Sequence, residues 1–238
     1  MEAPGAELGA TPLSGLLAYE LGESGWILLP SWVDRELGEL HVLVPGNRVV
    51  AIAAVTPRVT TLTPGWNLVT FTGAPATPVS ILFGGVDVTV DAVHRWNSAA
   101  GRFDSAFPLA PSFSTLSTVQ PRDALWVHVR GEASVDWAIF GGALPGLPRP
   151  LEPGWNLVSW VGATTNFTTA AIPLFGLAPA VFRWNATDEL YEVFNAGGPA
   201  FFNTLLEIGA LDGLWVFLAT DGPVAWPQPG LGPAVPGS

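Results

Sequence analysis

The chain has 238 residues, of which 49% are hydrophobic and 12% are charged, about half the usual share of charged residues. Its net charge of −11 argues against binding to nucleic acid, whose affinity comes largely from Lys and Arg, and against an anionic membrane surface. The sequence has no Cys, and all nine of its cations are Arg, which excludes disulfides, thiolate metal sites and a Schiff-base lysine. No apolar run approaches the roughly 18 residues of a membrane span.

Residues 1–60 are predicted to form an N-terminal β segment. The opening MEAPGAELGATP carries no signal-peptide pattern, and we expect it to be an initiator Met on a trimmed mature chain. ELHVLVPGNRVVAIA, residues 39–53, resembles the closing hairpin of the unit that follows it. We therefore interpret the segment, as a hypothesis, as a third unit that is either degenerate or incomplete. Because an isolated hairpin is marginal in water, we expect it to complete a small domain with LLAYEL and GWILLPSW, to pack on the next unit, or to add a strand to a neighbouring molecule.

One stretch of the sequence then occurs twice. LTPGWNLVTFTGA, residues 62–74, returns as LEPGWNLVSWVGA, residues 151–163, and the likeness continues at an offset of 88 or 89 residues: VHRWN becomes VFRWN, RDALWVHV becomes LDGLWVFL, and VDW becomes VAW. Such fixed-offset similarity indicates homologous units. We therefore predict one repeat module over residues 61–149, a second over residues 150–228, and a Pro/Gly-rich tail over residues 229–238.

Each module is predicted to hold about five strands and a short helix. Pro64-Gly65 and Pro153-Gly154 form a tight turn before a first strand, and Asn67 and Asn156 bond local backbone groups there. A short helix follows, capped by Thr77 in one copy and Asn166 in the other. An Arg-Trp-Asn strand, a short strand at Phe103 or Tyr191, and a closing hairpin complete the unit. The expected fold is mostly β, with two tandem modules that resemble small barrels or sandwiches.

Charged residues recur at matching positions in the two copies. Asp123 and Asp212 each lie three residues before a Trp, where an Asp side chain bonds backbone groups of a turn. Arg95 and Arg183 point away from the Trp that follows each of them, because neighbouring side chains of a strand alternate. We predict that each Arg reaches a nearby acid or a backbone carbonyl of its own module, with Asp123 and Asp212 as the first candidates.

The tryptophans divide into two sets. Four of them have counterparts in the second copy and are assigned to the module cores: Trp66, Trp96, Trp126 and Trp137, with Trp155, Trp184, Trp215 and Trp226. Trp26 and Trp32 have no counterpart, and Trp160 corresponds to Phe71. These last three are the candidates for a ligand or partner surface, since exposed aromatic rings anchor sugar faces and protein contacts.

The GWNLV…RWN…LWV pattern resembles a β-rich module found in tandem in secreted and cell-surface bacterial proteins. The resemblance implies an extracellular location, at the cell surface, and a non-enzymatic role. It names no characterised family and carries over no site residue.

No catalytic, cofactor-binding or metal-ligating residue is assigned. The sequence has no Gly-rich phosphate loop, no HExxH and no Gly-x-Ser-x-Gly. His94 and His128 stand where the second copy has Phe182 and Phe217, and a position that accepts Phe indicates packing rather than proton transfer. We therefore predict that the protein is not an enzyme and has no cofactor.

Repeats, scarce charge and the lack of a catalytic cluster favour a structural or adhesive component of a surface assembly or filament. Its partners would be further copies of itself or other surface proteins. The alternative is a carbohydrate-binding module that uses exposed Trp to hold a polysaccharide.

Overall fold

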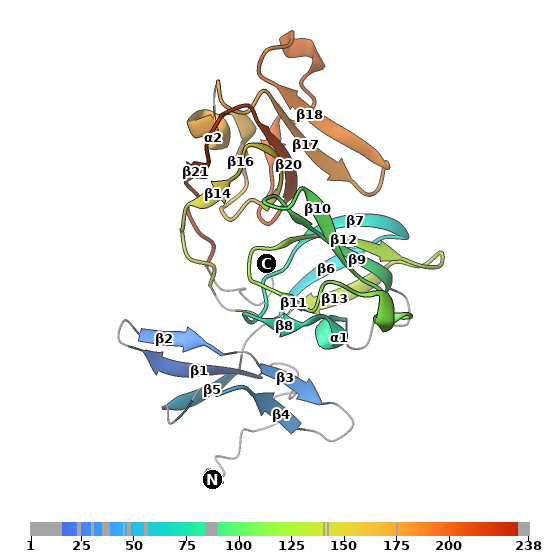
Figure 1. Cartoon of the computed structure of the whole chain (residues 1–238), viewed down its shortest axis with the longest axis vertical. Helices are drawn as coiled ribbons and strands as arrows, with labels where there is room; N and C mark the ends of the chain where they lie inside the picture. Colours follow the sequence, from blue (N-terminus) through green and yellow to red (C-terminus); the bar gives the residue numbers. More distant parts are fainter. Residues whose placement is uncertain are drawn as a thin grey trace.

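The computed structural model describes residues 16–22, 25–29, 31–34, 39–44, 46, 49–54, 57–83, 90–139, 141, 143–174 and 176–232. The fold is mostly β, with 47% strand and 9% helix. It comprises an N-terminal β segment and two similar modules, of which the first begins at Arg58 and the second at Arg149 (Figure 1). None of the described helices is long and apolar enough to span a membrane.

The elements of the N-terminal segment are β1 (Leu16–Gly22), β2 (Gly25–Leu28), β3 (Ser31–Asp34), β4 (Glu39–Val42) and β5 (Val50–Ala54). Those of module 1 are β6 (Arg58–Leu62), β7 (Gly65–Thr70), β8 (Thr77–Pro78), α1 (Val79–Leu82), β9 (Val90–Asn97), β10 (Arg102–Ala106), the 3-10 turn η2 (Pro111–Phe113), β11 (Thr118–Val119), β12 (Ala124–Val129) and β13 (Val135–Ile139). Those of module 2 are β14 (Arg149–Leu151), β15 (Gly154–Ser159), β16 (Thr165–Asn166), α2 (Phe167–Ala171), η3 (Ile172–Leu174), β17 (Ala180–Asn185), β18 (Leu190–Asn195), η4 (Ala200–Phe202), β19 (Glu207–Ile208), β20 (Gly213–Leu218) and β21 (Val224–Trp226).

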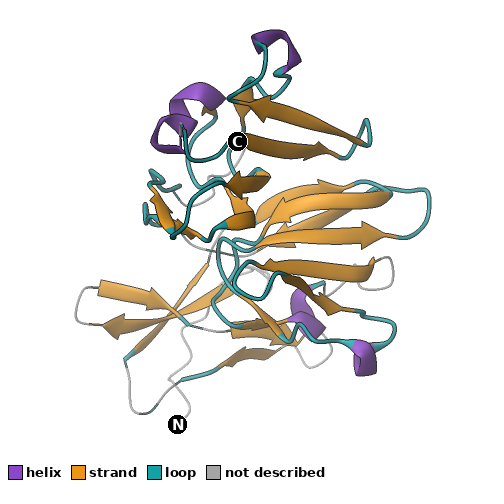
Figure 2. Ribbon diagram, turned by 45° about the horizontal axis from the view of Figure 1, so that its top comes forward, coloured by secondary structure: helices purple, strands orange, loops and turns teal. Residues whose placement is uncertain are grey.

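The two modules share one topology. The main sheet of module 1 has the order β10-β9-β12-β7, and that of module 2 has the equivalent order β18-β17-β20-β15. In both copies the short ribbons and the helix cover one face of this sheet (Figure 2). Among the described strands each main sheet stays open at both edges, so each module is a small sandwich.

The repeated phrase forms the predicted turn and strand. Gly65 and Gly154 take positive φ angles of 85° and 87°, which only glycine adopts readily. The Asn67 amide accepts a hydrogen bond from the Thr63 backbone at 2.9 Å and donates one to the Thr63 carbonyl at 2.8 Å. Asn156 makes the same pair of bonds to Glu152. The prediction for both asparagines is confirmed.

The predicted closing hairpin is wrong in both modules. β13 does not pair with β12 but with β6, the strand before the repeated phrase. Likewise β21 pairs with β14 rather than with β20. The reason is that β12 already has β7 on one side and β9 on the other, so no edge remains for β13. The chain instead leaves the main sheet. β13 then pairs with β6 in a separate two-stranded ribbon, which packs on the face of the main sheet that meets the module core.

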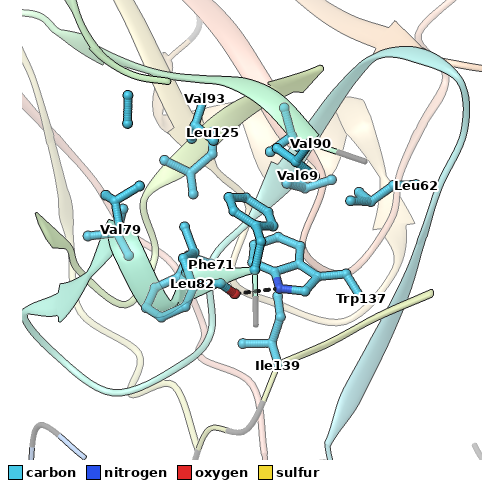
Figure 3. Packing of buried hydrophobic residues seen from close by; sticks show 14 of the residues in the cluster. Leu62, Val69, Phe71, Val79, Leu82, Val90, Val93, Leu125, Trp137 and Ile139 are labelled. Atoms are coloured by element: carbon cyan, nitrogen blue, oxygen red, sulfur yellow. Dashed lines mark hydrogen bonds between the residues drawn. The ribbon is translucent and has the colours of Figure 1, made fainter. Parts of the chain in front are cut away.

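A Trp of this second ribbon lies at the centre of each module core. Trp137 in β13 packs beside Phe83 with ring centroids 4.8 Å apart, and its indole donates a hydrogen bond to the Leu82 carbonyl at 3.0 Å (Figure 3). Trp226 makes the equivalent bond to the Ala170 carbonyl at 3.0 Å. The core assignment is therefore confirmed for Trp137 and Trp226.

The two short helices are both present, but only one has the predicted cap. The amide oxygen of Asn166 accepts a hydrogen bond from the Thr168 backbone at 3.0 Å, so it caps α2 as predicted. Thr77 does not cap α1, because its hydroxyl donates instead to the Ala74 carbonyl at 2.6 Å.

The predicted Arg–Asp pairs are confirmed. Arg95 lies 3.1 Å from Asp123, and Arg183 lies 2.5 Å from Asp212. Each Asp also accepts a hydrogen bond from the backbone of its turn, at Gln120 and Gly209 respectively. Each pair thus joins the Arg-Trp-Asn strand to the turn before the next strand of the sheet.

We expect Arg95→Gln to change stability little. The Arg95 side chain is partly exposed, and an ion pair of this kind contributes about 0–1 kcal/mol. The melting temperature, followed by circular dichroism, should fall by no more than a few degrees. A drop of about ten degrees or more would mean that the guanidinium has a structural role beyond this pair.

The N-terminal segment completes its own sheet. β5 pairs with β1, which is LLAYEL, and β1 pairs with β2 in the order β2-β1-β5. The predicted hairpin between residues 40–44 and 50–52 is wrong, because β4 pairs with β3 instead. Within the chain, the segment pairs with LLAYEL and with strands of GWILLPSW, as the first predicted outcome expects, and strand addition to a neighbouring molecule stays a prediction.

Candidate functional site

The main sheets of the two modules face each other through the repeated tryptophans. Trp96 donates a hydrogen bond from its indole to the Trp155 carbonyl at 2.8 Å, and Trp184 donates the equivalent bond to the Trp66 carbonyl at 2.7 Å. Trp96 and Trp184 occupy equivalent positions in the two modules, and so do Trp155 and Trp66. The two hydrogen bonds are therefore equivalent, and an approximate two-fold axis relates the modules. The interface is isologous, as in a symmetric dimer.

Ring contacts repeat the same symmetry. Trp96 lies 5.4 Å from Trp215, and Trp184 lies 5.6 Å from Trp126, both edge to face. Aromatic pairs favour this geometry because the positive edge of one ring meets the negative face of the other. Trp126, Leu157 and Ala124 are the buried centre of the contact.

The assignment of these six tryptophans to the module cores is therefore wrong. Trp66 and Trp155 are 38% and 43% exposed, and they lie at the margin of the interface. The expected alternation along the strand is present, but the Trp face of each main sheet meets the other module. The opposite face, which includes Val69 and Val158, meets the core of its own module.

Two aromatic pockets open at this interface, and they are symmetry twins. The Phe182 pocket has a volume of about 360 Å³ and is lined by Trp96, Trp155, Phe182, Tyr191 and Trp215. The His94 pocket has a volume of about 640 Å³ and is lined by Trp66, His94, Phe103, Ser105, Trp126, Trp184, Tyr191 and Trp215. Each takes four rings from one module and at least one Trp from the other, so neither pocket exists without the pairing of the modules.

No protein-family model, no curated protein and no solved structure matches this chain. The chemistry of the two pockets must therefore be read from their own residues.

The pockets differ in polarity. His94 and Ser105 line the His94 pocket, and their counterparts in module 2 are Phe182 and Val193. A ring nitrogen of His94 lies 2.7 Å from the Ser105 hydroxyl. His128 packs on Trp66 beside this pocket, with ring centroids 4.8 Å apart. One site is thus wholly aromatic, and the other combines aromatic faces with groups that form hydrogen bonds.

Tyr191 belongs to both pockets and adds a hydroxyl to each. Burial raises the pKa of Tyr191, and a hydrogen bond with Trp215 acts in the opposite direction. The phenol therefore stays protonated at neutral pH. The protonated O–H can donate a hydrogen bond to a ligand.

Burial lowers the pKa of His94, and the neighbouring His128 lowers it further. His128 itself lies 2.6 Å from Asp91. A lowered pKa means that, as pH falls through the ordinary value of 6.5, the unfolded chain takes up a proton before the folded chain does. The free energy of unfolding therefore falls as pH drops below about 6.5.

We expect His94→Phe, which installs the residue of the twin site, to remove this part of the pH dependence. Between about pH 7.5 and about pH 5, the wild type should lose more stability than the variant. Denaturant unfolding at both pH values measures the difference. Equal losses in the two proteins would show that His94 does not titrate differently in the folded and unfolded chains.

Of the three residues that the sequence singled out, only Trp160 has a described side chain, and it does not line these pockets. Trp160 is 4% exposed, packs on Trp226 in the core of module 2 and donates a hydrogen bond to the Ala163 carbonyl. The prediction that Trp160 is a surface residue is wrong. Trp160 follows directly after β15 and lies on the same side as Val158, which faces the core of module 2. Trp26 and Trp32 lie in β2 and β3, and their side chains fall outside the described part of the structure.

Among the described residues, no group of three or more His, Asp or Glu side chains is placed to hold a metal ion. The residues known to line the two pockets, all from the described part of the chain, include no carboxylate. What the arrangement offers is aromatic surface, an imidazole and hydroxyls, which together can bind a neutral ligand.

Proposed function

We propose that this chain is a non-enzymatic, extracytoplasmic adhesive protein that binds a neutral polysaccharide at its two aromatic pockets. The observation that carries the proposal is the pair of half-exposed tryptophans, Trp66 and Trp155, each at the mouth of a pocket made by both modules. A half-exposed indole leaves apolar surface in contact with water in the free protein, which is unfavourable. Aromatic rings in such positions are typical of residues that contact a ligand or a partner.

The chemistry of the pockets favours a sugar chain. A pyranose ring has an apolar C–H face that packs flat on an indole, and hydroxyls around its rim. Aromatic walls with a few placed polar groups suit such a ligand. His94, Ser105 and Tyr191 supply hydrogen-bonding groups at the pockets. The described residues of the lining include no carboxylate and no guanidinium, which favours a neutral sugar over a charged one.

The twofold arrangement supports binding of a chain rather than of a single sugar. Two pockets on one rigid body raise the effective concentration of the second contact once the first has formed. The resemblance to tandem modules of secreted and cell-surface bacterial proteins supports the extracellular location and the role in adhesion. Other surface proteins of the same assembly remain the proposed partners.

The test is retention on insoluble polysaccharides. The full chain is passed over cellulose, chitin and a β-glucan, and Trp66→Ala and Trp155→Ala are compared with it. We expect the wild type to bind at least one of the three, and each variant to bind it about tenfold more weakly, which corresponds to about 1.4 kcal/mol. The backbone carbonyls that hold the modules together are kept in both variants.

Leu190→Ser is the matched control, because Leu190 is also exposed but lines neither pocket. It should bind as the wild type does. A wild type that no polysaccharide retains contradicts the proposal, and so does retention that survives both Trp substitutions. Selective binding of a Pro-rich peptide, which also docks in aromatic grooves, would assign the pockets to a protein partner instead.

A further inference from the structure

Aromatic side chains alone make up the described lining of the Phe182 pocket: Trp96, Trp155, Phe182, Tyr191 and Trp215. The polar side-chain groups among them are the indole N–H groups and the Tyr191 hydroxyl. Three of the five residues are Trp, which has the largest ring system of any side chain. The pocket therefore offers a ligand the faces of aromatic rings above all.

The five rings stand at steep angles to one another and do not form a flat stack. Trp215 meets Trp155 at 89° with ring centroids 6.1 Å apart, and it meets Trp96 at 68° with centroids 5.4 Å apart. Phe182 meets Trp155 at 45° and Tyr191 at 81°. Walls set at such angles around about 360 Å³ can present several ring faces to one ligand. We call this set of five rings the aromatic cage.

Ring faces attract positive charge. The quadrupole of an aromatic ring is negative at the face and positive at the edge, so a cation within about 6 Å of a ring centroid is held, most strongly by Trp. A primary ammonium group would lose hydrogen bonds to water that the cage cannot replace. A quaternary ammonium group has no N–H to satisfy, because its charge is spread over methyl groups. Among cations, it is the class that suits this lining.

The charge of the whole chain also favours a cation. The net charge is −11, and a protein of one sign raises the local concentration of ligands of the other sign. Arg183 follows Phe182 in β17 and points to the other face of the strand. Its guanidinium pairs with Glu192 at 2.7 Å and with Asp212. The positive charge next to the cage in the sequence is therefore already neutralised.

The His94 pocket has an imidazole where the cage has Phe182. A ring nitrogen of His94 lies 2.7 Å from the Ser105 hydroxyl, so this ring is part of a polar pair. When protonated, His94 carries a positive charge that repels a second cation. The two pockets therefore differ in the ligands that they favour, and a cation is expected at the cage.

We propose that the Phe182 pocket binds a quaternary ammonium group, such as the trimethylammonium group of choline. Such a group presents C–H groups to the rings, as the apolar face of a pyranose does, but these C–H groups carry a share of positive charge. The inference adds a ligand class to one of the two pockets. It goes beyond the proposed function and does not rest on it.

Two ligands of the same shape test the proposal on the unaltered full chain. Isothermal titration calorimetry compares choline chloride with the uncharged alcohol in which carbon replaces the nitrogen of choline, at matched ionic strength. Because their apolar surfaces are nearly equal, the difference in affinity measures the effect of the charge. We expect one equivalent of choline per chain, bound about tenfold more tightly than the alcohol. Equal affinities, or no binding of choline, overturn the proposal.

Substitutions in the cage locate the site. Phe182→Leu and Trp155→Leu keep an apolar side chain but remove a ring face, and both residues line the Phe182 pocket alone. Each variant should bind choline about fivefold more weakly, and the affinity for the alcohol should change little. Thermal unfolding checks that each variant is folded. Leu190→Ser is the matched control, since Leu190 is exposed and lines neither pocket, and it should bind choline as the wild type does.

Two further measurements fix the pocket and the source of the group. Choline binding that is lost in Trp66→Ala and kept in Phe182→Leu would place the cation in the His94 pocket and overturn the proposal. Vesicles of phosphatidylcholine carry the same group on a lipid. Sedimentation of the wild type with these vesicles, lost in Phe182→Leu, would support the site with a lipid headgroup as its ligand. Choline binding without such sedimentation would support it with a soluble ligand.

The results also separate this inference from the proposed function. A chain that prefers choline to the alcohol but is retained by no polysaccharide supports the ammonium site and contradicts the proposed function. A chain that is retained by a polysaccharide but binds choline and the alcohol equally supports the proposed function and overturns the ammonium site.

Discussion

Trp226→Ala should destabilise module 2 by about 3–5 kcal/mol, the usual cost of removing a large core aromatic. The side chain is fully buried, packs on Trp160 with ring centroids 5.6 Å apart, and donates its indole hydrogen to the Ala170 carbonyl. Truncation leaves a cavity and an unpaired carbonyl on α2. Denaturant unfolding followed by fluorescence and by circular dichroism measures the loss.

Trp155→Ala is the control, because Trp155 is the same residue type in the same module but is 43% exposed. It should cost less than half as much, since most of the transfer and cavity contributions are absent there. Equal losses from the two substitutions would contradict the division into core and interface tryptophans. Unfolding in two separate transitions would not contradict this prediction, because the two modules have distinct cores.

Asn156→Ala should cost about 2–3 kcal/mol, because three hydrogen bonds of a buried amide to part-buried backbone groups would be lost. The Asn156 amide accepts from the Glu152 backbone and donates to the carbonyls of Glu152 and Gly154. It therefore holds the turn that begins the first strand of the main sheet. Hydrogen exchange should show faster exchange of the Glu152 amide, whose hydrogen bond is lost.

Asn166→Ala gives the comparison for this prediction. Asn166 is also in module 2 and also bonds backbone, but it is an exposed helix cap, and loss of such a cap costs about 1 kcal/mol. If Asn156→Ala is no more harmful than Asn166→Ala, the repeated Asn does not stabilise the turn as inferred.

The local features of the modules could be predicted from sequence because their causes are local. Gly65 must have a positive φ angle, Asn67 must reach its own turn, and Asp123 must face the Arg on the neighbouring strand of the sheet. Each prediction rests on a few neighbouring residues or on strand alternation. The mostly β fold and the repeat could also be predicted, because strand-forming residues and the repeated segments can be read directly from the sequence.

Apart from the Thr77 cap, the errors concern which strand or surface a strand meets. Alternation placed Trp66 and Leu68 on one face of β7, but it does not say whether that face meets its own module or another. The pairing of β13 with β6 depends on β12 having two partners already, which is a property of the whole sheet. A useful signal was nonetheless present: Trp66, Trp96 and Trp126 recur on one face, while Trp137 recurs on a separate ribbon. Two sets of repeated aromatics indicate two apolar surfaces, one inside the module and one between modules.

The isologous pairing of the modules has a consequence for how such a protein can evolve. In a dimer of identical subunits, every substitution alters both twin sites together. Joining the two subunits in one chain removes that constraint, because each half is then encoded separately. The pair His94 and Phe182 records such a divergence at equivalent positions. In a single chain, one pocket can therefore carry polar groups while its twin is lined by aromatic rings, as the described residues of the two pockets do here.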